Sequence, residues 1–173
     1  MEAGNINIIK YVRNFQYVPG SDCITACNPR ILRYADVLLL KAEAIVRTGG
    51  NLAEAIGILN QIRERARNST NDGKWTVNGD TPSTTPADLD ITESNRNTVL
   101  EWVFNERRLE LAFEEGHRWW DLRRRHLAGE IDIKQIDFGS RNANFQFEDY
   151  NIYFPLPNQE ILDNPYLDQN QGY

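Results

Sequence analysis

The clearest pattern in the chain is a run of apolar residues at helical spacing between residues 30 and 48. The polar residues Arg33, Asp36, Glu43 and Arg47 share one narrow stripe, and nearly all other positions are apolar. This pattern predicts a helix that is covered by other parts of the protein over most of its circumference.

A second helix is predicted at residues 51–68. Gly49 and Gly50 would end the first helix, because glycine adopts the left-handed backbone found just after many helices. Asn51 then stands three residues before Glu54, which is the spacing of a capping box. Apolar residues at helical intervals follow and give this helix one apolar face.

The two helices and their tight turn resemble a tetratricopeptide hairpin. Ala42 and Ala55 are small residues at the positions where that motif brings its helices close together, with one extra residue in the turn. A generic antiparallel pair is the alternative, since any close helix pair needs small residues somewhere. The pattern favours the tetratricopeptide-like pair.

The remaining segments complete a mainly α single domain over 1–173 with long loops and minor strand content. They comprise two more helices and three irregular or extended stretches: helices near 95–115 and 119–127, a long polar loop at 68–92, an irregular tail at 129–173 and strand-like residues at 5–18. Long loops in compact domains are uncommon and are often functional or disordered.

The charged run at 105–124 places carboxylates on an apolar helix face. Glu106 and Glu110 project onto the same face as several apolar residues, namely Val99, Trp102, Val103, Leu109 and Phe113. A buried carboxylate is costly unless it is paired and hydrogen-bonded, and the planar guanidinium of arginine satisfies both of its oxygens. We therefore expect a structural ion-pair network of these residues: Arg33, Glu106, Arg107, Glu110, Arg118, Asp121 and Arg123.

The same acids could instead be catalytic, as in a glycoside hydrolase, which needs one carboxyl of raised pKa and one ionised partner. Each acid of the run has an arginine within a helical turn, which would lower its pKa and make it a poor proton donor. His117 has no nucleophile nearby in the sequence, and no spacing links it to His126 as a metal pair. We therefore expect a protein without catalytic residues.

Composition and charge narrow the possible partners. The chain has 173 residues and a net charge of −6, which argues against a nucleic-acid partner because phosphate neutralisation needs a basic face. There is no apolar run long enough to span a bilayer and no leader-like start, so we expect the chain as given to be soluble. Cys23 and Cys27 do not form a zinc motif, and two free thiols are favoured over a short-loop disulfide. No metal and no cofactor are expected.

Four segments of the sequence resemble the SusD/RagB family of outer-membrane nutrient-binding proteins, in the family's order. They are the run Glu106–Arg124 (E-R-R-L-E-L-A-F-E-E-G-H-R-W-W-D-L-R-R), Asn28–Ala44 (N-P-R-I-L-R-Y-A-D-V-L-L-L-K-A-E-A), Leu59–Ala66 (L-N-Q-I-R-E-R-A) and the ending Phe154–Tyr173 with its F-P-L-P and N-P-Y-L-D-Q-N-Q-G-Y. Gln171 stands where the family usually has proline.

The resemblance implies the C-terminal part of a longer protein. The parent would be a lipid-anchored protein on the cell surface of a Bacteroidetes-type bacterium, meeting the outer membrane only through an anchor outside this chain. It would bind oligosaccharides or other nutrients and deliver them to a SusC-type TonB-dependent transporter. The family builds its glycan platform largely upstream of this region, so no known ligand residue can be carried over.

Trp75, in the polar loop, is the one local candidate for stacking on a sugar ring, and an ordinary loop anchor is its alternative role. A tetratricopeptide-type protein–protein adaptor without a glycan role is the competing function. Helices that are apolar nearly all round favour a packed globule over an adaptor groove. If an absent part of the parent packs on these helices, we expect the isolated chain to expose an apolar patch or to self-associate.

Overall fold

The computed structural model describes residues 31–68, 83–136 and 147–173, and these ranges are mainly helical without a strand. The elements in chain order are α1 (Tyr34–Arg47), α2 (Leu52–Asn68), α3 (Arg96–Glu110), α4 (His117–Leu127), two 3₁₀ turns η2 (Ile133–Gln135) and η4 (Asp149–Ile152), and α5 (Asn158–Asp163). The predicted mainly α class is therefore confirmed. The strand-like residues 5–18, the two cysteines and Trp75 lie outside the described ranges.

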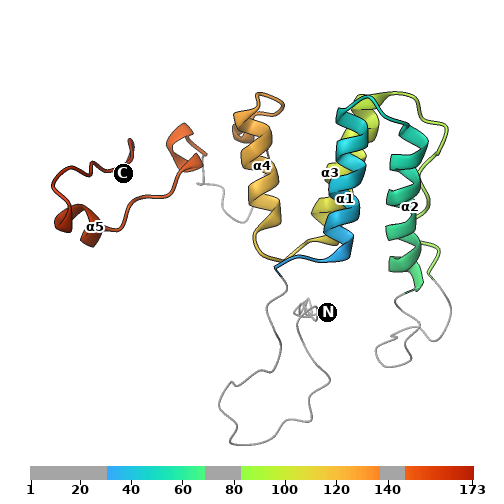
Figure 1. The fold of residues 1–173 in the computed structure, drawn as a ribbon, viewed down its shortest axis with the longest axis horizontal. Coiled ribbons are helices and arrows are strands. Elements are labelled where there is room, and N and C mark those ends of the chain that lie inside the picture. The colour runs from blue at the N-terminus through green and yellow to red at the C-terminus, as the bar shows by residue number, and fades with distance from the viewer. Residues whose placement is uncertain (1–30, 69–82, 137–146) are drawn as a thin grey trace, which may run out of the picture.

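Helices α1 and α2 form the predicted antiparallel hairpin (Figure 1). Ala42 and Ala55 are both fully buried, as a close approach of two helices requires. Gly49 takes the left-handed backbone with φ 83°, and the Asn51 side chain accepts a hydrogen bond from the Ala53 amide at 2.9 Å. Glu54 does not close a capping box, because its carboxylate pairs with Lys41 of α1 at 2.9 Å.

Helix α3 packs against both members of the hairpin and closes the main core. The residues at the centre of this core are fully buried aliphatic side chains: Leu39, Ile56, Leu59, Val99 and Val103. A smaller core joins α4 to the segments that follow it, through Leu122, Ile133, Phe147 and Ile152. The described residues thus form a three-helix core and a smaller satellite cluster beneath the irregular tail.

Polar side chains of α2 hold the irregular segment that leads into α3. Asn60 exchanges two hydrogen bonds with the Leu89 backbone, at 3.0 Å to its carbonyl and 2.7 Å from its amide. Arg63 and Arg67 donate to the carbonyls of Ala87 and Pro86 at 2.7 and 2.6 Å. These bonds satisfy backbone groups that have no strand or helix partner there.

Helix α3 begins as predicted but ends earlier than predicted. The Asn95 side chain caps its first turn by accepting from the amides of Asn97 and Thr98. The helix stops at Glu110 and does not continue to residue 115. At this end, Arg33 donates a hydrogen bond to the Glu110 carbonyl at 3.1 Å. Phe113 follows with φ 62°, so the chain turns away there.

Two predicted core residues lie at the surface: Leu109, which is still within α3, and Phe113, which lies beyond its end. Leu109 and Phe113 were placed on the buried face with Glu106, but they are 53% and 71% exposed. The turn lets α4 start at His117 after Gly116, whose φ is 71°. Since glycine tolerates this backbone and other residues do so rarely, Gly116 fixes the point of reversal.

Helix α1 is arranged differently from the prediction that it is covered over most of its circumference. Asp36 and Glu43, from its polar stripe, are each 4% exposed, whereas the apolar Val37 and Leu40 are 44% and 45% exposed. The polar stripe faces inward because arginines of α3 and α4 meet it there. The apolar residues left outside form an exposed stripe with Tyr34, which is 73% exposed.

Two neighbouring leucines of α1 test this arrangement. Leu39 is fully buried and Leu40 is 45% exposed. We expect Leu39→Ala to lower the free energy of unfolding by about 3 kcal/mol, because it leaves a cavity in the three-helix core. Leu40→Ala is the matched control and should cost less than about 1 kcal/mol. Urea unfolding followed by circular dichroism measures both, and equal losses would contradict the described orientation of α1.

Candidate functional site

The charged run at the end of α3 and along α4 contains a buried ion-pair network centred on Arg107. The Arg107 guanidinium donates from Nη1 to Asp36 Oδ1 at 2.7 Å and from Nε to Asp121 Oδ2 at 2.8 Å. All three side chains are 7% exposed or less. One arginine of α3 thereby joins a carboxylate of α1 to a carboxylate of α4.

A second part of the network surrounds Glu43 of α1. Arg124 of α4 binds both oxygens of this carboxylate at 2.6 Å each, in the bidentate geometry that suits a guanidinium. Arg47 adds a bond from its Nε at 2.7 Å. Burial opposes ionisation of Glu43, but these hydrogen bonds and the two positive charges outweigh it and hold the pKa of the carboxyl below its usual value.

Glu106 and Glu110 each meet arginines, as the sequence argument required. The arginine that binds Glu106 is Arg63 of α2, at 2.8 Å. Glu110 pairs with Arg33 at 2.9 Å and with Arg65 of α2 at 2.5 Å. Sequence reasoning missed Arg63 and Arg65 as partners, although they stand at alternate positions in the L-N-Q-I-R-E-R-A segment.

Arg118 and Arg123 were predicted to belong to this network, and neither pairs with a carboxylate of the described residues. The Arg123 Nε donates to the Ile152 carbonyl at 3.0 Å, and its guanidinium lies over the Tyr153 ring at 5.4 Å. Arg118 has no hydrogen bond or ion pair within the described ranges. The two side chains leave α4 in directions that miss Glu106 and Glu110, which face α1 and α2.

Glu106 also departs from the expectation that nearby arginines lower the pKa of every acid in the run. Burial raises the pKa of the Glu106 carboxyl, and the hydrogen bond and charge of Arg63 offset that effect only in part. The carboxylate is 5% exposed and lines neither of the two hollows described below. A substrate therefore has no described path to this acid.

The adjacent tryptophans of α4 are divided between core and surface. Trp119 packs on the satellite cluster beside Phe147 and Phe154, with ring centres 6.1 and 6.4 Å away. Trp120 is 50% exposed. The indole N–H of Trp119 is buried and has no hydrogen-bond partner among the described residues.

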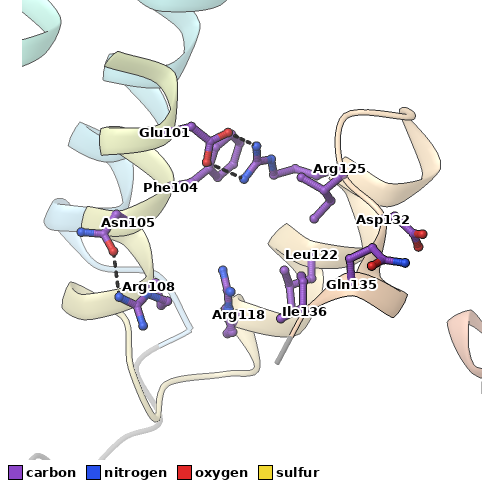
Figure 2. Close-up of a pocket in the computed structure, with 11 residues that line it drawn as sticks. Glu101, Phe104, Asn105, Arg108, Arg118, Leu122, Arg125, Asp132, Gln135 and Ile136 are labelled. Carbon is purple, nitrogen blue, oxygen red and sulfur yellow. Dashed lines mark hydrogen bonds and ion pairs between the residues drawn. The ribbon is translucent and has the colours of Figure 1, made fainter. Parts of the chain in front are cut away.

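A groove of about 510 Å³ lies between α3, α4 and the turn η2, and Figure 2 shows the side chains that line it. We call it the α3–α4 groove. Its lining consists of Glu101, Phe104, Asn105, Arg108, Arg118, Leu122, Arg125, Ile131, Asp132, Gln135 and Ile136. Arg125 and Glu101 close one end with an ion pair, and the Arg118 side chain extends into the space between the two helices (Figure 2).

A second hollow of about 570 Å³ lies in the tail, and we call it the tail hollow. Its lining consists of Glu148, Asp149, Tyr150, Tyr153, Asn170, Gln171 and Gly172. Tyr173 holds the two parts of the tail together, since its hydroxyl donates to the Tyr153 carbonyl at 2.8 Å. Asn170 adds a bond from its amide nitrogen to the Phe154 carbonyl at 2.7 Å.

The lining of the tail hollow combines tyrosine rings with amide and carboxylate groups. Tyrosine rings offer flat apolar faces with a polar rim, and carboxamides and carboxylates can hydrogen-bond hydroxyl groups. Gly172 is required at its position, because a Cβ there would lie 2.3 Å from the Tyr150 ring. Sequence reasoning missed this hollow, since its residues come from two separate parts of a segment classed only as irregular.

Within residues 31–68, 83–136 and 147–173, no group of three or more His, Cys, Asp or Glu side chains could hold a metal ion. None of the helices in the described part of the chain is long and apolar enough to cross a bilayer.

Two neighbouring arginines of α3 test the role of the network in stability. Arg107→Ala would leave Asp36 and Asp121 buried without their shared partner, so we expect a loss of about 3–5 kcal/mol in the free energy of unfolding. Arg108 is exposed, and Arg108→Ala should change stability by less than about 0.5 kcal/mol. Chemical denaturation gives both values. A loss below about 1 kcal/mol for Arg107→Ala would show that the ion pairs of Arg107 with Asp36 and Asp121 are not needed for stability.

Glu43 provides a test by pH. Its pKa is lowered in the folded state from an ordinary value of 4.5, so its ionised form stabilises the fold fully above pH 4.5. That contribution is lost as the pH falls below 4.5 and through the depressed pKa. We expect Glu43→Gln to cost about 2 kcal/mol at neutral pH. The difference from the unmodified chain should shrink as the pH falls below 4.5. A difference that does not change with pH, measured by urea unfolding at several pH values, would refute the assigned role.

Known proteins with similar sequences give these features a family context. The model of the SusD family matches residues 5–173. SusD-like protein P38 of Formosa agariphila is 36% identical over 163 residues, which cover 94% of this chain and 28% of that protein. SusD-like protein P2 of the same organism is 31% identical over 174 residues, covering 96% of this chain and 30% of that protein.

The chain thus spans less than a third of the length of these curated relatives. SusD-like protein P25 of Formosa agariphila is 29% identical over 150 residues, or 84% of this chain and 25% of that protein. No solved structure is significantly similar to the chain. Because the family match covers nearly the whole sequence, the chain belongs to the SusD family.

Proposed function

We propose that this chain is the C-terminal part of a cell-surface protein that binds oligosaccharides and delivers them to a SusC-type TonB-dependent transporter. The observation that carries the proposal is the SusD family match over residues 5–173. The alignments to curated relatives, which cover 28% and 30% of those proteins, support its assignment to a longer parent. In this proposal the parent is held at the outer membrane by a lipid anchor.

The tail hollow is the part of the described structure that we assign to sugar contact. Tyr153 is 51% exposed and Tyr150 is 38% exposed, so both rings can be reached by a ligand. Asn170 and Gln171 stand beside them at the same hollow. Exposed aromatic rings next to amide groups are a common way to hold a neutral sugar, with stacking for affinity and hydrogen bonds for orientation. Trp75 remains a proposed contact as well, in a segment outside the described ranges.

We further propose that the chain binds without catalysing a reaction and without a cofactor. The acids of the ion-pair network hold arginines in fixed geometries: Asp36 and Glu43 of α1, together with Glu106, Glu110, Glu114 and Asp121 of the charged run, all have arginine partners. Glycoside hydrolysis needs two carboxyl groups facing one bond of the sugar, one of them able to donate a proton. The raised pKa of Glu106 does not meet that need, since its carboxylate is buried against Arg63.

The binding proposal is tested with neutral oligosaccharides and one tyrosine. We expect isothermal titration with a panel of glucan and galactan hexasaccharides to detect binding by the 173-residue chain. Tyr153→Ala should weaken that binding about tenfold, a loss of about 1.4 kcal/mol. The matched control is Tyr166→Ala, because Tyr166 is 94% exposed and does not line the hollow. Equal effects of the two variants would reject the tail hollow as the site.

Transporter capture separates this function from the adaptor alternative. A longer parent protein used as bait on solubilised outer membranes should recover a TonB-dependent transporter. Recovery of other proteins without any transporter, together with no oligosaccharide binding, would favour a tetratricopeptide-type adaptor.

A further inference from the structure

The α3–α4 groove is lined by two arginines that have no carboxylate partner among the described residues. Most arginines of the described ranges pair with a carboxylate: Arg33, Arg47, Arg63, Arg65, Arg67, Arg107, Arg124 and Arg125. Arg96 and Arg123 instead donate to backbone carbonyls. Arg108 and Arg118, the remaining two, both line the groove.

These two arginines make few hydrogen bonds with the described residues. Arg108 donates from Nη2 to the side-chain oxygen of Asn105 at 2.8 Å, which is a neutral acceptor. Arg118 has no hydrogen-bond acceptor within the described ranges. Figure 2 shows Arg118 extending from the start of α4 towards the groove and Arg108 coming from α3 on the other side. Their guanidinium groups therefore border the same space from two helices.

The two charges also influence one another. Burial lowers the pKa of Arg118, and the positive charge of Arg108 lowers it further, while Asp121 opposes the shift. Like charges at one groove repel each other, and an anion between or beside them lowers that repulsion. An oxyanion would relieve this repulsion and supply acceptors for the donors of both groups.

We propose that the α3–α4 groove binds the carboxylate of an acidic sugar residue through Arg118 and Arg108. This inference rests on the proposed function, because it names a class of oligosaccharide that the protein would take. Arg118 would hold the carboxylate with its fork of N–H groups, and Arg108 would supply a second positive charge. Asn105 and Gln135 offer amide groups for the hydroxyls of the sugar, beside an apolar wall of Leu122 and Ile136.

The size and the lining of the groove favour a sugar unit over a protein surface. Its volume of about 510 Å³ lies within the range of small-ligand sites. Its walls combine apolar side chains with a few polar groups, as sites for small molecules do. A neutral sugar would supply neither guanidinium group with a carboxylate partner, so charge favours an acidic sugar over a neutral one.

The experiment compares three probes at low ionic strength by isothermal titration with the 173-residue chain. The probes are a trimer of galacturonate, a neutral galactan trimer and a trimer of glutamate. We expect the galacturonate trimer to bind about tenfold or more tightly than the other two. Arg118→Gln should remove most of that advantage, and Arg118→Lys should remove part of it, because lysine keeps the charge but loses the fork.

The matched control is Lys41→Gln, which removes one positive charge at a site 57% exposed and paired with Glu54. It should leave binding of the galacturonate trimer unchanged, and circular dichroism confirms that each variant is folded. Equal binding of the acidic and neutral trimers, or no effect of Arg118→Gln, overturns the inference. Tighter binding of the glutamate trimer also overturns it, since the occupant would then be a protein carboxylate.

The Tyr153→Ala variant distinguishes failure of the groove inference from failure of the proposed function. If neutral oligosaccharides bind and respond to Tyr153→Ala while Arg118→Gln has no effect on any probe, the groove inference fails and the proposed function stands. If the galacturonate trimer alone binds and responds to Arg118→Gln, the groove inference holds and the tail hollow fails. No binding of any probe by the folded chain rejects both.

Discussion

The arrangement of the helices depends on one shared guanidinium, that of Arg107. It binds Asp36 of α1 and Asp121 of α4 from its own place on α3, with all three groups almost completely buried. The buried residues of α4 are Asp121, Leu122 and Arg125, so this helix has little apolar surface with which to dock. Charged contacts therefore set the position of α4, and with it one wall of the α3–α4 groove. Such pairs need not add net stability over an apolar replacement, but they accept only one geometry.

The sequence predicted the features that are local or depend on the period of a helix. The α1–α2 hairpin followed from Gly49, Asn51 and two small residues, each of which acts within its own turn. Burial of Glu106 and Glu110 near arginines followed from charge on an apolar face. The end of α3 could not be predicted this way, because the carbonyl of Glu110 there accepts a hydrogen bond from Arg33, which lies 77 positions earlier in the chain.

The sequence also could not predict which partner each arginine of a charged cluster binds. Arg118, Arg123, Arg124 and Arg125 follow one another closely in α4, and composition does not distinguish them. The fold sends Arg124 and Arg125 to carboxylates, Arg123 to a carbonyl and Arg118 to an open groove. The tail hollow could not be predicted for a different reason. Its two halves meet through long-range contacts such as the hydrogen bond from the Tyr173 hydroxyl to the Tyr153 carbonyl.

The inward polar stripe of α1 has a consequence for how the protein opens. Moving α1 away from α3 and α4 would expose apolar core and, at the same moment, separate Asp36 from Arg107 and Glu43 from Arg124. Partial opening of that kind has two separate costs, so α1, α3 and α4 should exchange their amide hydrogens as one cooperative unit. Helix α5 has no buried residues and shares none of these bonds. Fluctuations of the tail can therefore occur while the three helices stay closed, so the proposed sugar-contact surface can change shape without disturbing them.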